Sequence, residues 1–453
     1  MRHMTSLLLN ALGLLGLPWL LASAPVEADA PFLLTLDAAR ELALERNTSL
    51  QRQANAADLS QVSVDHARAA LLPDLRLSAS ASENFGRAVE PLTGDVDGEH
   101  SRSLSLQASS SLNLFSGFGD VAAIESARQS AAASAGDLQR SREAVLYQVT
   151  GEYLLAILDL ELISIEDERL DAERGQLDRI ESLHEVGERP WADVLQQRAA
   201  VAGAELDQLT ARQRYELDLL TLKDLLGFAA GVAIHLQSPI HLGSPDEAAL
   251  APVDGDLQSL LADALQDRAD VQAQQARVRA AVASMQVARS GYWPSLDLTV
   301  GAGSSYNSQV SAFGFGDQFV DTNPRASVGL SLSLPIFDRQ LTDVAVSRSR
   351  IQLADAKLVS DATVREVGMQ LEQALLNHRI AVARFDVSQT QVQYAGEALA
   401  ATEARYFEGL ATLVEVGQAR AQYVEAAGNR ATAQTTVTLR RLEIELQRGG
   451  SPL

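Results

Sequence analysis

Two stretches of the chain contain residue types that bind ligands in other proteins. Residues 117–122 read Gly-Phe-Gly-Asp-Val-Ala, which imitates the glycine-rich fingerprint of a dinucleotide site. The stretch that matches it later in the chain, at 339–341, has no glycine. A parallel crossover strand is not expected either, so we do not predict nucleotide binding. His235 and His241 lie close together in sequence, and we favour two surface loop histidines over a pair of metal ligands.

Other chemistry finds little support. Cysteine is absent, which excludes disulfides, thiol chemistry and cysteine-based zinc sites. No nucleophile, base and acid form a catalytic arrangement, so we predict no enzyme activity, no metal and no cofactor. The net charge of -22 argues against nucleic acid, whose phosphates would be repelled, and against coating of anionic lipid.

The remaining candidates are two carboxylates, Asp193 and Glu415, which occupy matching places in the chain. Each follows a short glycine-containing turn and stands early in a helical pattern. Acids in the first turn stabilise a helix through its dipole, so both have an ordinary structural interpretation. A functional interpretation depends on the elements that position them.

Those elements come from a duplication. Pro73 and its neighbours match Pro294 and its neighbours without a gap. After a shift of one residue, Leu114 matches Ile336 and the turn at Gly187 matches the turn at Gly409. Such self-similarity indicates two copies of one elongated unit.

Each copy contains two kinds of sequence pattern, one typical of strands and one typical of helices. Alternating apolar and polar residues predict strands at about 75–84, 103–114, 295–304 and 326–335. The stretches 118–186 and 340–408 have no proline and are rich in alanine, leucine, glutamate and arginine, so each predicts a long helix. A short turn and a return helix follow each of them, which predicts helical hairpins at about 118–227 and 340–448. We therefore divide the chain into a first repeat at 29–227, a connector at 228–253, a second repeat at 254–448 and a C-terminal tail at 449–453.

The N-terminus has the features of a signal peptide. Arg2 and His3 precede an apolar run and a stretch of small residues, so we predict a cleaved signal at 1–28. The alternative is a membrane anchor, but the run is short and Pro18 breaks it.

The predicted strands have the length and the one apolar face of tilted strands that cross a bilayer. A bilayer leaves no strand edge unsatisfied, and four strands cannot close into a barrel. The chain must therefore share a barrel with copies of itself. Sequence periodicity does not give the number of copies; three copies with twelve strands is one solution.

The order of these elements resembles the outer membrane efflux protein (TolC-like) family. The local matches are Leu71-Leu72-Pro73, Trp293-Pro294, Leu334-Pro335-Ile336-Phe337-Asp338 and Arg405-Tyr406-Phe407-Glu408-Gly409. The resemblance implies an α+β membrane protein, in which a homotrimer forms a twelve-stranded β-barrel and a long α-helical coiled-coil tunnel in the periplasm. It implies a passive channel in the outer membrane of a Gram-negative bacterium. The implied partners are a periplasmic adaptor (membrane fusion) protein and an inner-membrane transporter, which together with the channel export small molecules.

The resemblance also implies a gate at the tips of the helical hairpins. Glu415 occupies the position of a carboxylate ring, and Gln418 stands where other members carry a second acid. Tyr406 and Asp193 match a Tyr–Asp contact that holds some gates shut, whereas Ala411 replaces the basic residue of that network. Three carboxylates around a narrow pore would favour cations.

Two further surfaces are expected. The tip loops are candidates for adaptor docking, through Gly187, Glu188, Arg189, Gly409, Leu410 and Ala411. Aromatic residues at one end of the strands suit a membrane-interface girdle, although packing at a helix–strand junction is the alternative; they are Tyr292, Trp293, Phe115 and Phe337.

Two other functions stay open at this point. Within the same architecture, the cargo could be a protein secreted by a type I secretion system. From another class, the chain could be a soluble periplasmic coiled-coil scaffold whose strands form a small water-soluble sheet.

Overall fold

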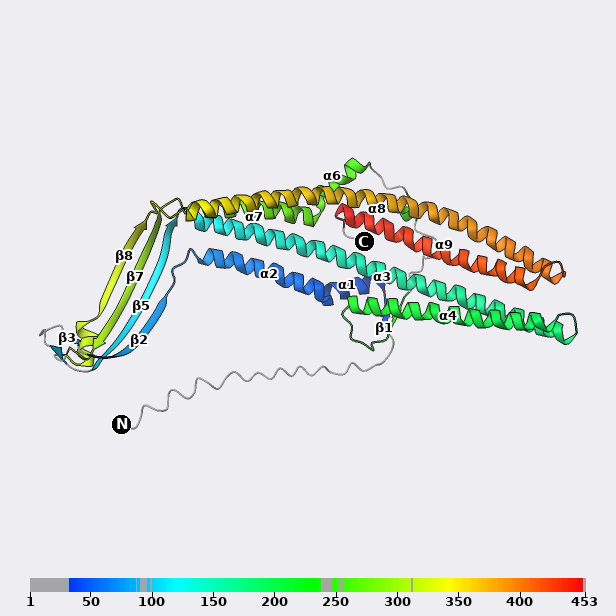
Figure 1. The fold of residues 1–453 in the computed structure, drawn as a ribbon, viewed down its shortest axis with the longest axis horizontal. Helices are drawn as coiled ribbons and strands as arrows, with labels where there is room; N and C mark the ends of the chain where they lie inside the picture. The colour runs from blue at the N-terminus through cyan, green and yellow to red at the C-terminus, as the bar shows by residue number, and fades with distance from the viewer. Residues whose placement is uncertain are drawn as a thin grey trace, which may run out of the picture.

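The computed structural model describes residues 32–86, 88–89, 96–97, 100–237, 247–251, 256–310 and 313–450. The predicted signal peptide, His241 and the end of the predicted tail lie outside the described residues. The described part is elongated, with a β-sheet at one end and two helical hairpins that run to the other end (Figure 1).

Each half begins with a pair of short helices and continues into a long helical hairpin. In the first half these are α1 (Leu36–Arg46), α2 (Thr48–Ala69), α3 (Gly119–Glu185) and α4 (Trp191–Leu225). In the second half they are α6 (Leu257–Asp267), α7 (Ala269–Ser290), α8 (Leu341–Phe407) and α9 (Leu413–Arg448), and a short helix α5 (Glu247–Leu250) precedes them. Among the described residues, no helix is long and apolar enough to cross a membrane.

The four predicted strands form one antiparallel sheet. They are β2 (Arg76–Phe85), β5 (His100–Ser116), β7 (Ser295–Asn307) and β8 (Arg325–Ser333), in the order β2-β5-β7-β8. One face of the sheet is largely apolar, with Leu298 opposite Leu330. The other face is rich in serine, and the hydroxyls of Ser80 and Ser105 lie 2.7 Å apart. The strands β2 and β8 are the two open edges. A two-residue pair, β3 (Ala88–Val89) and β4 (Val96–Asp97), extends from the β2–β5 hairpin.

The stretch that imitates a nucleotide fingerprint is a strand-to-helix corner. Gly117 and Phe118 both have left-handed backbone, with φ of 61° and 67°. A side chain at Gly117 would collide with Ser290 O and Trp293 Cβ, each 2.6 Å from an added Cβ. At the matching corner Arg339 and Gln340 take the same backbone, so the corner requires the conformation even where it is costly for residues other than glycine.

Some elements were not predicted from the sequence. The strand β1 (Phe32–Leu34) pairs in parallel with β6 (Ile234–Leu236), and Tyr153 Oη donates to Leu34 O at 3.0 Å beside them. His235 therefore lies in a strand rather than a loop, with its side chain exposed. A π-helical turn, η1 (Asp317–Thr322), precedes β8.

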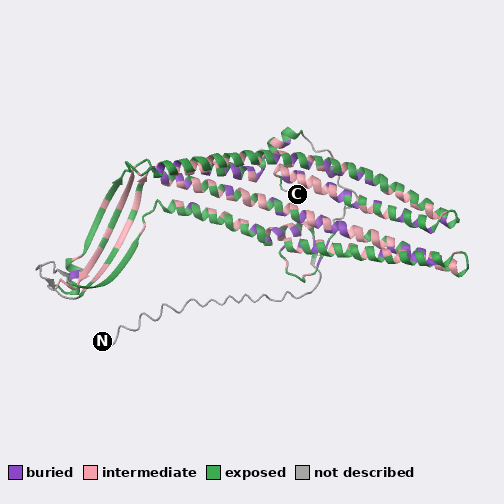
Figure 2. Cartoon of the chain, viewed as in Figure 1, coloured by how far each residue is buried: buried purple, intermediate pink, exposed green. Residues whose placement is uncertain are grey.

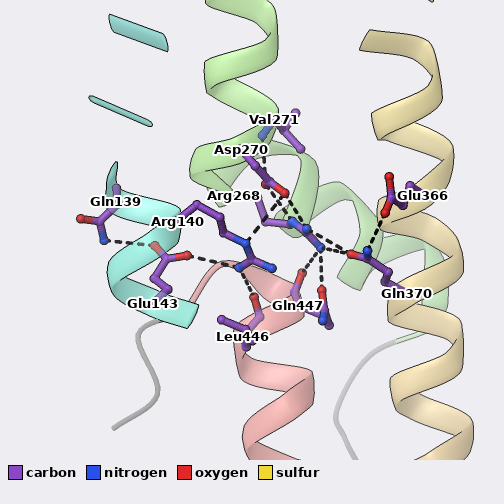
Figure 3. Close-up of polar contacts among 10 residues, drawn as sticks. All are labelled: Gln139, Arg140, Glu143, Arg268, Asp270, Val271, Glu366, Gln370, Leu446 and Gln447. Carbon is purple, nitrogen blue, oxygen red and sulfur yellow. Dashed lines mark hydrogen bonds and ion pairs between the residues drawn. The ribbon is translucent and has the colours of Figure 1, made fainter. Parts of the chain in front are cut away.

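A buried arginine fixes the end of the last helix to the middle of the molecule (Figure 3). Arg268, between α6 and α7, donates to Gln447 Oε1 at 2.8 Å and to Asp270 Oδ2 at 2.7 Å. Arg140 of α3 donates to Leu446 O at 2.8 Å. At the matching junction Asn47 donates to Leu225 O at 3.0 Å, so each return helix ends on the junction of its own half.

Buried residues follow narrow seams between helices, and much of the remaining surface is exposed (Figure 2). Large apolar side chains on α2, α8 and both edge strands are among the exposed ones. Such surface on a single chain indicates contact with lipid or with another protein.

Candidate functional site

The two hairpin tips lie side by side at the helical end of the molecule (Figure 1). Each chain reversal has a glycine in left-handed backbone, Gly187 with φ of 80° and Gly409 with φ of 76°. A buried apolar cluster joins the two tips; its members are Ile180, Val194, Tyr406, Leu413 and Val416. The tips are therefore packed on one another within a single chain.

An arginine covers the buried tyrosine of the second tip. The guanidinium carbon of Arg189 lies 4.2 Å from the centre of the Tyr406 ring, and Arg189 Nη2 donates to Tyr406 O at 2.9 Å. This pairs a cation with an aromatic face and a backbone acceptor. Sequence matching placed Ala411 where a basic residue was expected, and Arg189 is the matching residue of the first half. The repeat itself was the signal that could have identified Arg189.

The expected Tyr–Asp contact is not a hydrogen bond in the single chain. The buried Tyr406 Oη has no hydrogen-bond partner among the described residues. Burial raises the pKa of the Tyr406 phenol, Arg189 opposes this shift and the charge of Asp193 adds to it. Asp193 itself is half-buried in the first turn of α4. A phenol so placed stays protonated at neutral pH.

Glu415 forms a capping box with Thr412. Thr412 N donates to Glu415 Oε2 at 2.6 Å, and Glu415 N donates to Thr412 Oγ1 at 3.3 Å. The hydrogen bonds from Thr412 lower the pKa of Glu415, so the carboxylate is charged at neutral pH. Its side chain is exposed, as is that of Gln418. Glu415 therefore caps its own helix in addition to standing in the first turn, while the place of both residues in a pore ring stays a prediction.

Next to the tips, farther along the helices, an ionic network that was not predicted joins all four long helices. Arg420 of α9 lies 3.3 Å from Glu173 of α3 and 2.5 Å from Glu403 of α8. Gln197 of α4 donates to Glu173 O at 3.0 Å and also to the Glu173 carboxylate. Arg420 and Glu173 are both buried. Removing one partner of such a buried ion pair would leave the other charge buried without compensation, which strongly destabilises a fold.

The four predicted interface aromatics lie where the sheet meets the helices. Phe118, which was not predicted, links two of them: its ring centre is 5.1 Å from that of Phe115 and 6.3 Å from that of Trp293. Tyr292 Oη donates to Asp343 Oδ1 at 2.5 Å, and Phe337 is exposed. Junction packing therefore accounts for part of this group, and contact with lipid headgroups stays a prediction.

The described residues contain no cluster of three or more histidine, aspartate and glutamate side chains that could hold a metal. The tips thus offer charge, a packed tyrosine and exposed loops. Such a site can bind or gate.

Comparison with known proteins places this geometry in context. The sequence model of the outer membrane efflux protein family matches residues 39–228 and again residues 260–449. The outer membrane protein TolC of Escherichia coli (strain K12) is 24% identical over 410 residues, which cover 88% of this chain and 79% of TolC. The pyoverdine export outer membrane protein OpmQ of Pseudomonas aeruginosa is 26% identical over 363 residues, 79% of this chain and 73% of OpmQ.

Solved structures share the fold. The outer membrane protein VceC of Vibrio cholerae superposes with a TM-score of 0.75 at 20% identity, over 92% of this chain and 97% of VceC. The CusC channel superposes with a TM-score of 0.78 at 17% identity, over 93% and 94% of the two chains. The three chains thus share one fold.

Proposed function

We propose that this chain, which belongs to the outer membrane efflux protein family, assembles as a homotrimer into a passive exit duct. The twelve strands of three copies would close a barrel in the outer membrane, and the helices would form a tunnel in the periplasm. Cargo would enter at the hairpin tips from an inner-membrane transporter and a periplasmic adaptor, and would leave through the barrel.

The open sheet is the observation that supports a barrel shared between copies, and the number three is what the family resemblance implies. It has four strands, and β2 and β8 each present an unpaired edge. Unpaired backbone groups are not tolerated in lipid, and closed barrels have about eight strands or more. At about 1.5 Å per residue, the 67 residues of α3 reach on the order of 100 Å away from the sheet.

The gate proposal rests on the paired tips. Apolar packing and the Arg189–Tyr406 contact hold the two hairpins of a chain together, so opening requires these contacts to break or slide. Glu415 and Asp193 would line the entrance in three copies each. Differential binding of the adaptor to the open state would supply the driving free energy.

The ion selectivity of the channel tests whether Glu415 forms a carboxylate ring at the entrance. The Glu415→Gln variant keeps a side-chain oxygen for the cap but loses the charge, so the cation preference of the channel in planar bilayers should fall. Glu425→Gln, an exposed carboxylate farther along α9, is the matched control. Reversal potentials equal to wild type for both variants would remove Glu415 from the pore, although the trimeric channel would still stand.

A separate variant tests whether the adaptor docks on the second tip loop. Leu410 is exposed in the second tip loop, and Leu410→Asp should abolish export in cells while leaving the trimer and its conductance unchanged. Export at the wild-type level would exclude this loop from the adaptor contact.

A further inference from the structure

We propose that the serine-rich face of the sheet contains a binding site, centred on Arg325, for the carboxylate of a small hydroxylated molecule. Arg325 is the first residue of β8, which begins at the end of the sheet away from the helices (Figure 1). Cargo would therefore reach this site last, close to the outer opening. This rests on the proposed function, because polar faces of barrel strands point into the lumen, and it adds a class of cargo.

The site is a hollow of about 220 Å³ that crosses β5, β7 and β8. The register of the strands explains why it is empty. Gly303 of β7 lies opposite Gln107 of β5 on one side and Arg325 of β8 on the other. In the next row of the same face, Gly301 lies opposite Ser327. Because neighbouring strands are ~4.8 Å apart, the two side chains that flank Gly303 start about 10 Å apart, with no side chain between them.

Packing of the strands requires glycine at only one of these two β7 positions. A Cβ added to Gly303 would lie 2.6 Å from the backbone oxygen of Leu106, so the close approach of β5 excludes a side chain there. A Cβ added to Gly301 would meet the Ser327 hydroxyl at 3.2 Å and the Ala108 oxygen at 3.9 Å. Because the hydroxyl can rotate away, a substitution at Gly301 can fill the hollow without breaking the sheet.

Arg325 is a cation without an acid beside it, although the chain has a net charge of -22. Among the described residues, its guanidinium has one hydrogen-bond acceptor, Ser305 Oγ, which lies 3.2 Å from Nη2. The four strands of the sheet contain two acidic residues, and Glu83 lies on the apolar face. The other, Asp297, is six residues from Gly303 along β7, which is about 20 Å at ~3.3 Å per residue. The Arg325 charge is therefore available to an anionic ligand.

The charge and the lining of the hollow indicate the chemistry of the ligand. A guanidinium binds carboxylates and phosphates through paired hydrogen bonds. One cation balances one carboxylate, whereas a phosphate monoester carries about −1.5 to −2 charges and would leave negative charge over. The side chains of Ser105, Ser327 and Gln107 line the hollow and can donate and accept hydrogen bonds, which suits the hydroxyl groups of an organic acid. Arg325 is exposed, so binding is weak and cargo can leave.

Current block in planar bilayers tests the site. Gluconate, a hydroxylated monocarboxylate, is added on both sides of the channel in sodium chloride and should interrupt the current in a concentration-dependent way. Arg325→Gln removes the charged partner of the carboxylate, so the half-blocking concentration should rise at least about tenfold. Arg102→Gln is the matched control, because Arg102 lies on the apolar face, where its Nε donates to Glu83 at 2.9 Å. Its half-blocking concentration should equal that of wild type.

Two further variants separate a built site from a general effect of charge. Gly301→Thr fills the hollow without changing any charge, so it should weaken the block while the ion selectivity in sodium chloride alone stays at the wild-type value. Arg325→Lys keeps the charge but loses the planar pair of donors, so its half-blocking concentration should lie between those of wild type and Arg325→Gln. The conductance of each variant in sodium chloride shows that it has folded and inserted.

The outcomes distinguish the site from the duct that contains it. Gluconate block at the wild-type level in Arg325→Gln or in Gly301→Thr would overturn the site and leave the duct. Equal block by sorbitol, which has the hydroxyl groups but no carboxylate, or tighter block by inorganic phosphate would overturn the assignment to a carboxylate. A protein that conducts no current would overturn the duct itself, and with it a site inside the duct.

Discussion

The two helical hairpins have one plan but differently placed charges. In the first, Arg198 and Glu181 lie 2.7 Å apart with side chains 53% and 37% exposed. At the matching positions of the second, Arg420 and Glu403 lie 2.5 Å apart, but Arg420 is only 9% exposed and also contacts buried Glu173. The difference arises because α9 packs on α3 within the chain. Both hairpins therefore contain the same ion pair, but packing against α3 buries only the second one and so changes its contribution to stability.

The largest expected effect comes from removing the buried arginine. Arg420→Ala leaves Glu173 buried without its counter-charge, which should destabilise the tips by about 3–5 kcal/mol. Arg198→Ala, the matched control, should change stability by no more than about 1 kcal/mol, since exposed pairs contribute little. Hydrogen exchange of peptides from the first turns of α9 measures both. Equal protection in the two variants would mean that burial does not distinguish the hairpins.

A second contrast lies in the middle of the hairpins. Asp159 on α3 is buried, with Asp218 of α4 beside it and the half-exposed Arg214 3.1 Å from its Oδ1. Burial and Asp218 raise the pKa of Asp159 to about 7 in spite of Arg214. The matching residue on α8 is the buried Ala381. Only the first hairpin therefore carries a buried acid at this level.

This acid should make stability depend on pH. The raised pKa means that folded Asp159 keeps its proton between about pH 4 and 7, where the unfolded chain has lost it. Stability should therefore fall as pH rises through that window. Asp159→Asn removes the dependence and should stabilise the protein at pH 8 by about 2 kcal/mol. Urea midpoints at pH 5 and pH 8 provide the measurement, with Ala381→Ser as a control; an unchanged pH profile in Asp159→Asn would contradict the assignment.

The sequence predicted the four strands and both hairpins because their periods are strong and occur twice. It did not predict the buried charges, because Glu173, Arg420 and Asp159 look like surface residues of a helix until its packing partners are known. The tips show the same limit. Tyr406 and Asp193 were paired by resemblance, whereas the contact that forms uses Arg189, whose place beside Tyr406 depends on how one hairpin lies on the other.

The Arg189–Tyr406 contact gives a smaller effect that tests how the tips are joined. Arg189→Ala loses the contact with the ring and the hydrogen bond to Tyr406 O, which together should cost about 1–2 kcal/mol. The hairpins should then separate more often, which would appear as more frequent opening in single-channel records. Arg189→Lys, which keeps the charge but not the planar group, should fall between Arg189→Ala and wild type. Opening as rare in Arg189→Ala as in wild type would show that the apolar cluster alone holds the tips.

The smallest expected effect concerns the Tyr406 hydroxyl. Because Tyr406 Oη is buried and has no hydrogen-bond partner among the described residues, Tyr406→Phe removes an unsatisfied group and should leave stability within about 0.5 kcal/mol of wild type or raise it. Tyr406→Ala, by contrast, opens a cavity in the cluster that joins the tips and should cost about 3–5 kcal/mol. If Tyr406→Phe instead opened the channel as readily as Tyr406→Ala, the hydroxyl would have to bond Asp193 in the assembled trimer, and the closed tip would differ from that of the single chain.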